Sequence, residues 1–155
     1  MNLTELLRLA ILIEEKGYLF YSKLSGQIRD QHIRQTIEKL ADDEKTHVKQ
    51  FKTLLGDVSL MQLNNRGDLE KFNLSRIWSE EALNNLKAAG PQAEIPQSWN
   101  EALQLGIQAE KDSILFYHEL FYALPEGSAK SAVGKLLKEE EMHLLELRAY
   151  LEDEN

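Results

Sequence analysis

The stretch "LADDEKTHVKQF", residues 40–51, contains the pattern Glu-x-x-His, and the pattern recurs in "LLKEEEMHLLEL", residues 136–147. Four residues fill the two patterns: Glu44, His47, Glu140 and His143. Because three residues make nearly one helical turn, the two side chains of each pair lie on the same side of a helix. A helix that carries both groups on one face can present them together to its neighbours.

Each copy of the pattern has a further glutamate thirty residues upstream, Glu14 before Glu44 and Glu110 before Glu140. These positions belong to an internal repeat with an offset of 96 residues, which also relates Tyr21 to Tyr117 and His47 to His143. The repeat predicts two similar hairpins related by a pseudo-twofold axis.

Length and composition indicate one helical domain over residues 1–155. A chain of 155 residues can bury a sizeable core, and only three prolines interrupt it. The net charge of -8 argues against nucleic acid or an anionic membrane as a partner. The absence of cysteine excludes disulfides, thiolate nucleophiles and iron–sulfur clusters.

The N-terminal residues do not resemble a secretory signal. They contain a short apolar run before Glu14, but no basic segment and no small-residue cleavage site. No stretch of the sequence is long and apolar enough to span a bilayer. We therefore expect a cytoplasmic protein without a membrane partner.

Apolar residues recur at alternating steps of four and three residues in four segments, which is typical of a helical bundle. The predicted helices cover residues 3–27, 30–55, 98–124 and 128–152. Turn residues agree with these limits. "PEG", residues 125–127, separates the last two helices, and Asp30 and Ser98 are suitable N-caps.

Residues 56–97 lack a sustained apolar pattern and contain several Gly and Pro residues. "SEEALNNLKAAG", residues 79–90, predicts one short helix within them. The segment is long enough to return the chain along a bundle. The predicted fold is therefore an all-α four-helix bundle, made of hairpin 3–55, crossover 56–97 and hairpin 98–152. An unstructured linker between two domains is the alternative.

Each of the four apolar patterns is interrupted near the middle of its helix by one or two polar residues. There are six of them in total: Glu14, Glu44, His47, Glu110, Glu140 and His143. Each glutamate lies about fifteen residues from its hairpin bend, or about 22 Å at helical rise. The glutamates of each hairpin therefore stand level, and a pseudo-twofold axis can bring both pairs into one layer of four carboxylates and two imidazoles.

Such a layer requires bound cations. Buried carboxylates cost several kcal/mol unless they are paired, and no Lys or Arg lies on the apolar faces. Two divalent ions would balance the charge, and the donor set suits iron or manganese, with zinc also possible. Ferritin-like di-iron bundles have the same ligand set: one Glu from each of two helices, and Glu-x-x-His from each of the other two.

Residues beside the six predicted ligands allow two interpretations each. Tyr21 and Tyr117 lie two turns past the upstream glutamates and would either hydrogen bond to ligand carboxylates or serve as ordinary core tyrosines. Small residues lie one turn away from the same glutamates: Ala10, Gly17, Gly106 and Ser113. They would leave room for a small substrate or permit close helix packing.

Other polar residues near the predicted layer fall off the apolar faces. Glu15, Glu139 and Glu141 flank predicted ligands, and we expect them to be exposed. His32 and His118 belong to no such pattern, so we assign them no site.

The sequence resembles the rubrerythrin-type branch of the ferritin-like superfamily over both hairpins. The resemblance rests on the two stretches quoted first, together with "IEEKGYLFYSKLS", residues 13–25, and "AEKDSILFYHEL", residues 109–120. It implies two iron ions held by Glu14, Glu44, His47, Glu110, Glu140 and His143. It also implies that Tyr21 and Tyr117 hydrogen bond to these ligands.

Two differences separate the chain from rubrerythrins proper. It has no cysteines and therefore no rubredoxin domain. Ile107 stands where those proteins usually carry a further carboxylate tied to peroxide reduction. The resemblance implies the metal site, but this second difference counts against peroxidase activity.

We expect a di-iron oxidoreductase that acts on hydrogen peroxide or dioxygen. Electrons would come from an external donor, because the sequence contains no second redox centre. The resemblance implies that this donor is a rubredoxin-like protein. The alternatives are a ferroxidase that stores or delivers iron, and a non-catalytic metal-binding bundle. We expect a homo-oligomer, specifically a dimer.

Overall fold

The computed structural model describes residues 2–64 and 95–153, and these form four long α-helices. The helices are α1 (Leu3–Gln27), α2 (Gln31–Asn64), α4 (Trp99–Ala123) and α5 (Ser128–Asp153). The predicted all-α class and four-helix bundle are confirmed. The short helix predicted at 79–90 lies outside the described residues.

Local side chains fix the helix ends. Asn2 and Glu5 form a reciprocal capping box at the start of α1. The Ile33 N–H donates to Asp30 Oδ1 at 2.9 Å before α2, and Ser98 caps α4. In the turn before α5, Gly127 has a φ of 152°, which L-residues with a side chain rarely adopt.

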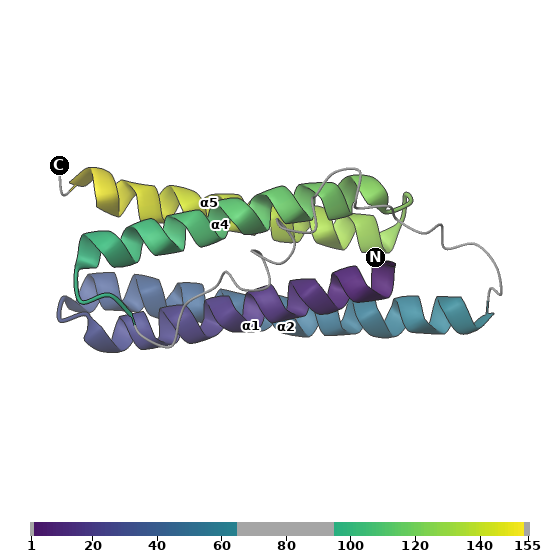
Figure 1. Cartoon of the computed structure of the whole chain (residues 1–155), viewed down its shortest axis with the longest axis horizontal. Helices are drawn as coiled ribbons and strands as arrows, with labels where there is room; N and C mark the ends of the chain where they lie inside the picture. Colours follow the sequence, from purple (N-terminus) through teal and green to yellow (C-terminus); the bar gives the residue numbers. More distant parts are fainter. Residues whose placement is uncertain (1, 65–94, 154–155) are drawn as a thin grey trace.

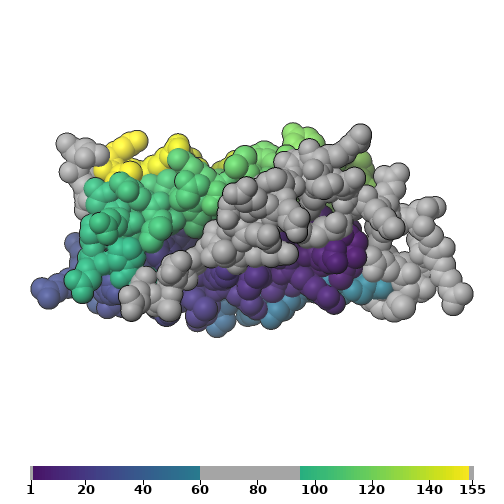
Figure 2. Space-filling view, in the orientation of Figure 1, coloured from purple at the N-terminus to yellow at the C-terminus, as the bar shows by residue number. Residues whose placement is uncertain are grey.

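The four helices pair as two antiparallel hairpins, α1 with α2 and α4 with α5, stacked in two layers (Figure 1). Helix α2 ends at one end of the bundle, and α4 begins at the opposite end. Residues 65–94, the main part of the predicted crossover, lie outside the described residues. Where α1 and α4 are both visible, their side chains meet directly (Figure 2).

Helix α2 is longer than predicted, because it continues to Asn64 instead of ending near residue 55. The prediction stopped at Gly56, but one glycine inside a helix costs only about 1 kcal/mol relative to alanine. Val58, one turn beyond Leu54, is 5% exposed and packs in the core. Continued burial of apolar side chains outweighs the cost of the glycine.

Two apolar clusters fill the bundle, one toward each end. The first includes Leu6, Phe51 and Leu136, and the second includes Phe20, Ile37 and Leu103. Each cluster draws residues from both hairpins, so both ends of the bundle are held by apolar packing. Tyr117 belongs to the first cluster and Tyr21 to the second.

Within residues 2–64 and 95–153, no helix combines the length and the apolar character needed to cross a bilayer.

Candidate metal centre

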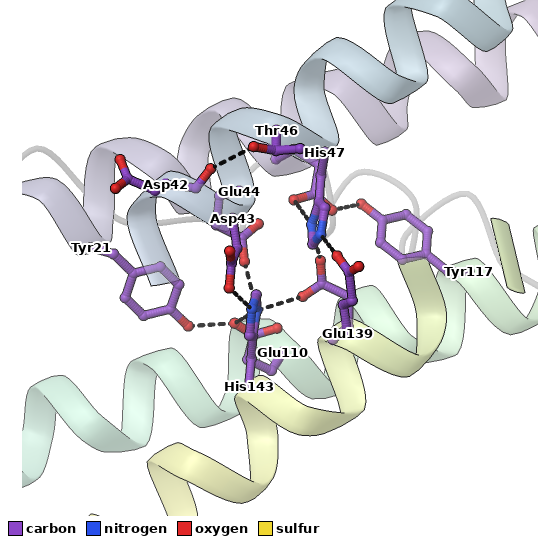
Figure 3. A network of polar contacts seen from close by, with 12 residues as sticks. Tyr21, Asp42, Asp43, Glu44, Thr46, His47, Glu110, Tyr117, Glu139 and His143 are labelled. Atoms are coloured by element: carbon purple, nitrogen blue, oxygen red, sulfur yellow. Dashed lines mark hydrogen bonds and ion pairs between the residues drawn. The ribbon is translucent and has the colours of Figure 1, made fainter. Parts of the chain in front are cut away.

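The six polar residues predicted to meet in the bundle core do so. Glu14, Glu44, His47, Glu110, Glu140 and His143 are each at most 4% exposed. They come from all four helices and lie between the two hairpins (Figure 3). A layer of this composition inside a protein core is rare, because carboxylates and imidazoles are usually solvated.

The six residues form two overlapping groups of four. One group is Glu14, Glu44, His47 and Glu140, and the other is Glu44, Glu110, Glu140 and His143. In each group, one ligand atom per residue lies within 4.8 Å of all the others. Glu44 and Glu140 belong to both groups, so two metal ions here would share two carboxylates.

Each histidine directs its Nδ1 atom toward the carboxylates. His47 Nδ1 lies 2.7 Å from Glu140 Oε1 and 3.3 Å from Glu14 Oε2. His143 Nδ1 lies 3.1 Å from Glu44 Oε1 and 3.4 Å from Glu140 Oε2. The inner nitrogen of each ring is therefore the one placed to bind a metal ion.

The outer nitrogen of each histidine contacts a carboxylate from the other hairpin. His143 Nε2 lies 3.1 Å from Asp43 Oδ2, and His47 Nε2 lies 2.5 Å from Glu139 Oε2 (Figure 3). A carboxylate that accepts from the outer N–H leaves the inner nitrogen free to bind metal. The two carboxylate residues, Asp43 and Glu139, are related by the 96-residue offset.

Sequence reasoning missed the roles of Asp43 and Glu139. Glu139 is exposed as predicted, yet its carboxylate reaches His47. The available signal was a carboxylate directly before each Glu-x-x-His glutamate, at equivalent positions of the repeat. Glu15 and Glu141 are exposed as predicted, and His118 has a long contact of 3.7 Å with Glu141.

Two buried tyrosines close the layer at opposite ends. Tyr21 donates to Glu110 Oε1 at 2.5 Å, and Tyr117 donates to Glu14 Oε1. Burial is the main cause of the strongly raised pKa of both phenols, and the neighbouring carboxylates raise it further. Each tyrosine therefore remains a hydrogen-bond donor to a predicted ligand, which is the first of the two interpretations drawn from the sequence.

The carboxylates strongly perturb one another. Burial raises the pKa of Glu44 and of Glu140 well above 4.5, and the neighbouring carboxylates raise it further. For Glu14, burial acts in the same direction, but contacts with Glu44, His47 and Tyr117 outweigh it and lower the pKa. Without a cation, protons therefore compensate part of the negative charge.

The two histidines compensate the remaining negative charge of the carboxylates. Burial would lower their pKa, but hydrogen bonds and charge interactions with carboxylates outweigh it. Glu14 and Glu140 act on His47, and Glu110 and Glu140 act on His143. The pKa of each histidine is raised from 6.5 to about 11. Metal ions and protons therefore compete for the same ligand atoms.

The donor set fits two divalent ions. Glu140 Oε1 is buried and meets none of the described residues in hydrogen-bond geometry; its contact with His47 Nδ1, at 2.7 Å, is an ion pair. A cation bound between the carboxylates would complete the surroundings of this oxygen. Four carboxylates and two imidazoles suit iron, manganese or zinc.

The small residues predicted near the site have different surroundings. A Cβ added at Gly17 would lie 3.1 Å from Glu44 Oε2, so glycine makes room for this carboxylate. A Cβ added at Gly106 would meet Leu147 at 3.2 Å, in apolar packing. Ile107 is also packed in the apolar cluster and is 7% exposed.

Comparison with known proteins agrees with this arrangement. A profile of the family described as rubrerythrin matches residues 5–151. A crystal structure from Thermotoga maritima, described as a ferritin-like diiron-carboxylate protein, matches with a TM-score of 0.73 and 28% sequence identity. The match covers 100% of this chain and 97% of that one. No curated protein matches the chain.

Proposed function

The chain belongs to the rubrerythrin family, and from this premise we propose that it is a di-iron oxidoreductase that reduces hydrogen peroxide or dioxygen. The observation that carries the proposal is the buried pair of four-residue groups that share Glu44 and Glu140. Shared carboxylates would hold two ions close together, and a pair of ferrous ions, once bound, would supply the two electrons that convert one peroxide and two protons into two waters.

Each predicted ligand has a proposed role. Glu14 and His47 would hold one ion, and Glu110 and His143 the other. Glu44 and Glu140 would contact both ions. The apolar clusters at either side exclude bulk water, which strengthens electrostatic interactions inside the site. Iron is the metal that the family suggests, and manganese and zinc fit the same donors.

The test of the proposed activity is a comparison of oxidants. The full chain is loaded with ferrous iron without oxygen and mixed with peroxide or dioxygen, while the near-ultraviolet ferric absorption is recorded. Oxidation of two irons per chain, much faster with peroxide than with dioxygen, would support peroxide reduction. The reverse preference would support dioxygen as the oxidant. Iron that stays ferrous with both oxidants would refute the proposal.

Two variants test the ligand set separately from the activity. Glu44→Ala should abolish binding of both ions, because its carboxylate belongs to both groups. Glu14→Ala should affect mainly one ion, because its carboxylate belongs to one group. Binding stoichiometry, measured without oxygen, distinguishes the two results. Equal behaviour of the two variants would contradict the sharing of Glu44.

Continued turnover requires an external electron donor. The sequence has no cysteine to hold an iron–sulfur centre of its own, and the family suggests a rubredoxin-like protein, which we propose as the donor. We also propose that the chain forms a dimer, which a measurement of native mass would test. A shell of many subunits would instead point to iron storage.

Iron oxidation and delivery is the second candidate function. The observation that favours it is Ile107, an apolar residue packed where rubrerythrins usually carry a further carboxylate. Without that carboxylate, the centre has one fewer oxygen ligand with which to follow a change of iron charge. Release of ferric iron after each oxidation, followed with a ferric chelator, would support this candidate over a retained di-iron centre.

A further inference from the structure

A cavity of about 350 Å³ lies between α2 and α5 and borders the candidate metal centre. His143 lines it, although this residue is only 2% exposed. Asp43 and Glu139, whose carboxylates contact the outer nitrogens of the two histidines, line it as well. The cavity therefore connects the outside of the bundle with the outer edge of the buried layer.

The position of the cavity follows the internal symmetry of the chain. Six of the residues that line it form three pairs related by the 96-residue offset: Asp43 with Glu139, Thr46 with Met142, and Gln50 with Glu146. Equivalent residues face each other only across the pseudo-twofold axis. The cavity therefore lies on this axis, which also relates the two four-residue groups of the candidate metal centre.

The buried centre requires such a passage. Its six residues are at most 4% exposed, and an apolar cluster fills the bundle on either side of them. A hydrated divalent ion would have to cross several layers of hydrocarbon to reach the centre along the bundle axis. Between α2 and α5, every residue that lines the cavity except Met142 is polar.

The charge of the cavity suits a cation. Asp43, Glu139 and Glu146 contribute three carboxylates to the cavity. They outnumber its two positively charged groups, the ammonium of Lys39 and the imidazole of His143, which lie 3.0 Å and 3.1 Å from Asp43 Oδ2. Glu146 Oε2 is shielded from solvent and accepts no hydrogen bond from the described residues. If the Glu146 side chain turns into the cavity, this oxygen can replace a water molecule of an incoming ion without breaking a hydrogen bond.

We propose that this cavity is the route by which divalent metal ions reach the centre, an inference that rests on the proposed metal centre. A route differs from a binding site in its kinetics. Blocking a route slows entry and exit by the same factor and leaves the equilibrium affinity unchanged. Removing a ligand lowers the affinity.

The test uses Co²⁺ as a probe, because its visible absorption reports coordination and oxygen does not oxidise it under mild conditions. Met142 is 58% exposed at the rim, so Met142→Trp adds a large side chain there without opening the core. Leu145→Trp is the matched control, since Leu145 is 64% exposed on the same helix but does not line the cavity. Thr46→Trp places the same side chain at the equivalent position of α2.

Stopped-flow mixing measures Co²⁺ entry, and a chelator chase measures exit. We expect Met142→Trp and Thr46→Trp to slow both rates at least about tenfold, with two ions still bound per chain at the original affinity. Leu145→Trp should load at the wild-type rate. Wild-type rates in both cavity variants would overturn the proposal, and so would slower loading in the Leu145 control.

A charge variant tests the electrostatic contribution. Glu146→Gln removes one carboxylate from the cavity without changing a predicted ligand. We expect entry to slow roughly threefold at low salt and to depend less on ionic strength. Glu152→Gln, an exposed carboxylate that does not line the cavity, should leave both unchanged. These rates do not depend on redox turnover, so an inactive protein that still binds two ions would refute the proposed function and not the route.

Discussion

Replacing Gly17 with alanine has two opposing effects: it increases helix propensity, and it places a methyl group against the side chain of Glu44. In the interior of a helix such as α1, alanine is favoured over glycine by about 1 kcal/mol. The new methyl group would lie 3.1 Å from Glu44 Oε2 and 3.3 Å from its Cδ atom. The Glu44 side chain would have to move by a few tenths of an ångström.

In the metal-free protein, the two effects should nearly cancel. Forcing a side chain away from its preferred rotamer costs about 0.5 to 1.5 kcal/mol, similar to the gain in propensity. We therefore expect the free energy of unfolding of Gly17→Ala to stay close to that of the wild type. Gly56→Ala is the control, because a Cβ at Gly56 meets nothing within 4 Å. It should stabilise the protein by about 1 kcal/mol.

With metal ions bound, the two substitutions should separate further. Glu44 belongs to both four-residue groups, so its displacement affects both ions. A loss of about 1 to 1.4 kcal/mol in binding corresponds to a fivefold to tenfold lower overall affinity. Gly56→Ala should bind both ions as the wild type does. Urea unfolding with a chelator and anaerobic ferrous titration provide the two measurements.

One result would refute this reasoning. If Gly17→Ala stabilises the metal-free protein as much as Gly56→Ala and binds metal ions with wild-type affinity, the space beside Glu44 has no role in placing its carboxylate. A loss of affinity in both variants would instead point to a general effect of alanine in these helices.

Three further predictions concern the surroundings of the ligands. Carboxylate contacts raise the pKa of His47 and His143 from 6.5 to about 11, so their stabilising contribution in the metal-free protein is complete below pH 6.5 and is lost as the pH rises toward 11. The urea midpoint measured with a chelator should therefore fall over this range, and a rising midpoint would contradict the assignment. Tyr117→Phe leaves Glu14 Oε1 without its hydrogen-bond donor. It should destabilise the metal-free protein by about 1 to 3 kcal/mol in urea unfolding. An unchanged free energy of unfolding would show that another donor takes the place of Tyr117. Asp43→Asn should lower metal affinity about 10-fold to 100-fold. Asp42→Asn, an equal change of charge at an exposed neighbour, should leave the affinity unchanged. Equal losses of affinity in a metal titration would show that charge alone, and not the contact with His143, is responsible.

The bundle was predictable because its pattern is repeated four times and interrupted at one depth. A buried polar residue within an apolar face is informative, since its cost requires an explanation. Six such residues, equally far from two hairpin bends, define a single layer. The helix limits followed from turn residues at Asp30, Ser98 and Gly127. At Gly56 the same reasoning failed, because packing outweighed the propensity of one glycine.

The contacts of Asp43 and Glu139 were harder to predict. Both positions face away from the apolar side of their own helix, and by periodicity alone they are exposed. Their contacts depend on how closely α2 approaches α5, a distance that no pattern within either helix encodes. The same holds for Gly17, whose role depends on the rotamer of a side chain on another helix.

The contacts between the hairpins are reciprocal. Asp43 meets His143 as Glu139 meets His47, and Tyr21 meets Glu110 as Tyr117 meets Glu14. This is the rule of a twofold homodimer, in which each contact occurs twice. A single ancestral hairpin with one set of these residues could therefore have built the whole centre by self-association.

After duplication and fusion of such a hairpin, its two copies could acquire different residues. The copies now differ at Asp43 and Glu139, at Gly17 and Ser113, and at Gln50 and Glu146. Two ions that were interchangeable in a symmetric ancestor would experience different surroundings in this chain. One ion can then be held more tightly than the other by the residues themselves, whereas the two empty sites of a strict homodimer are identical.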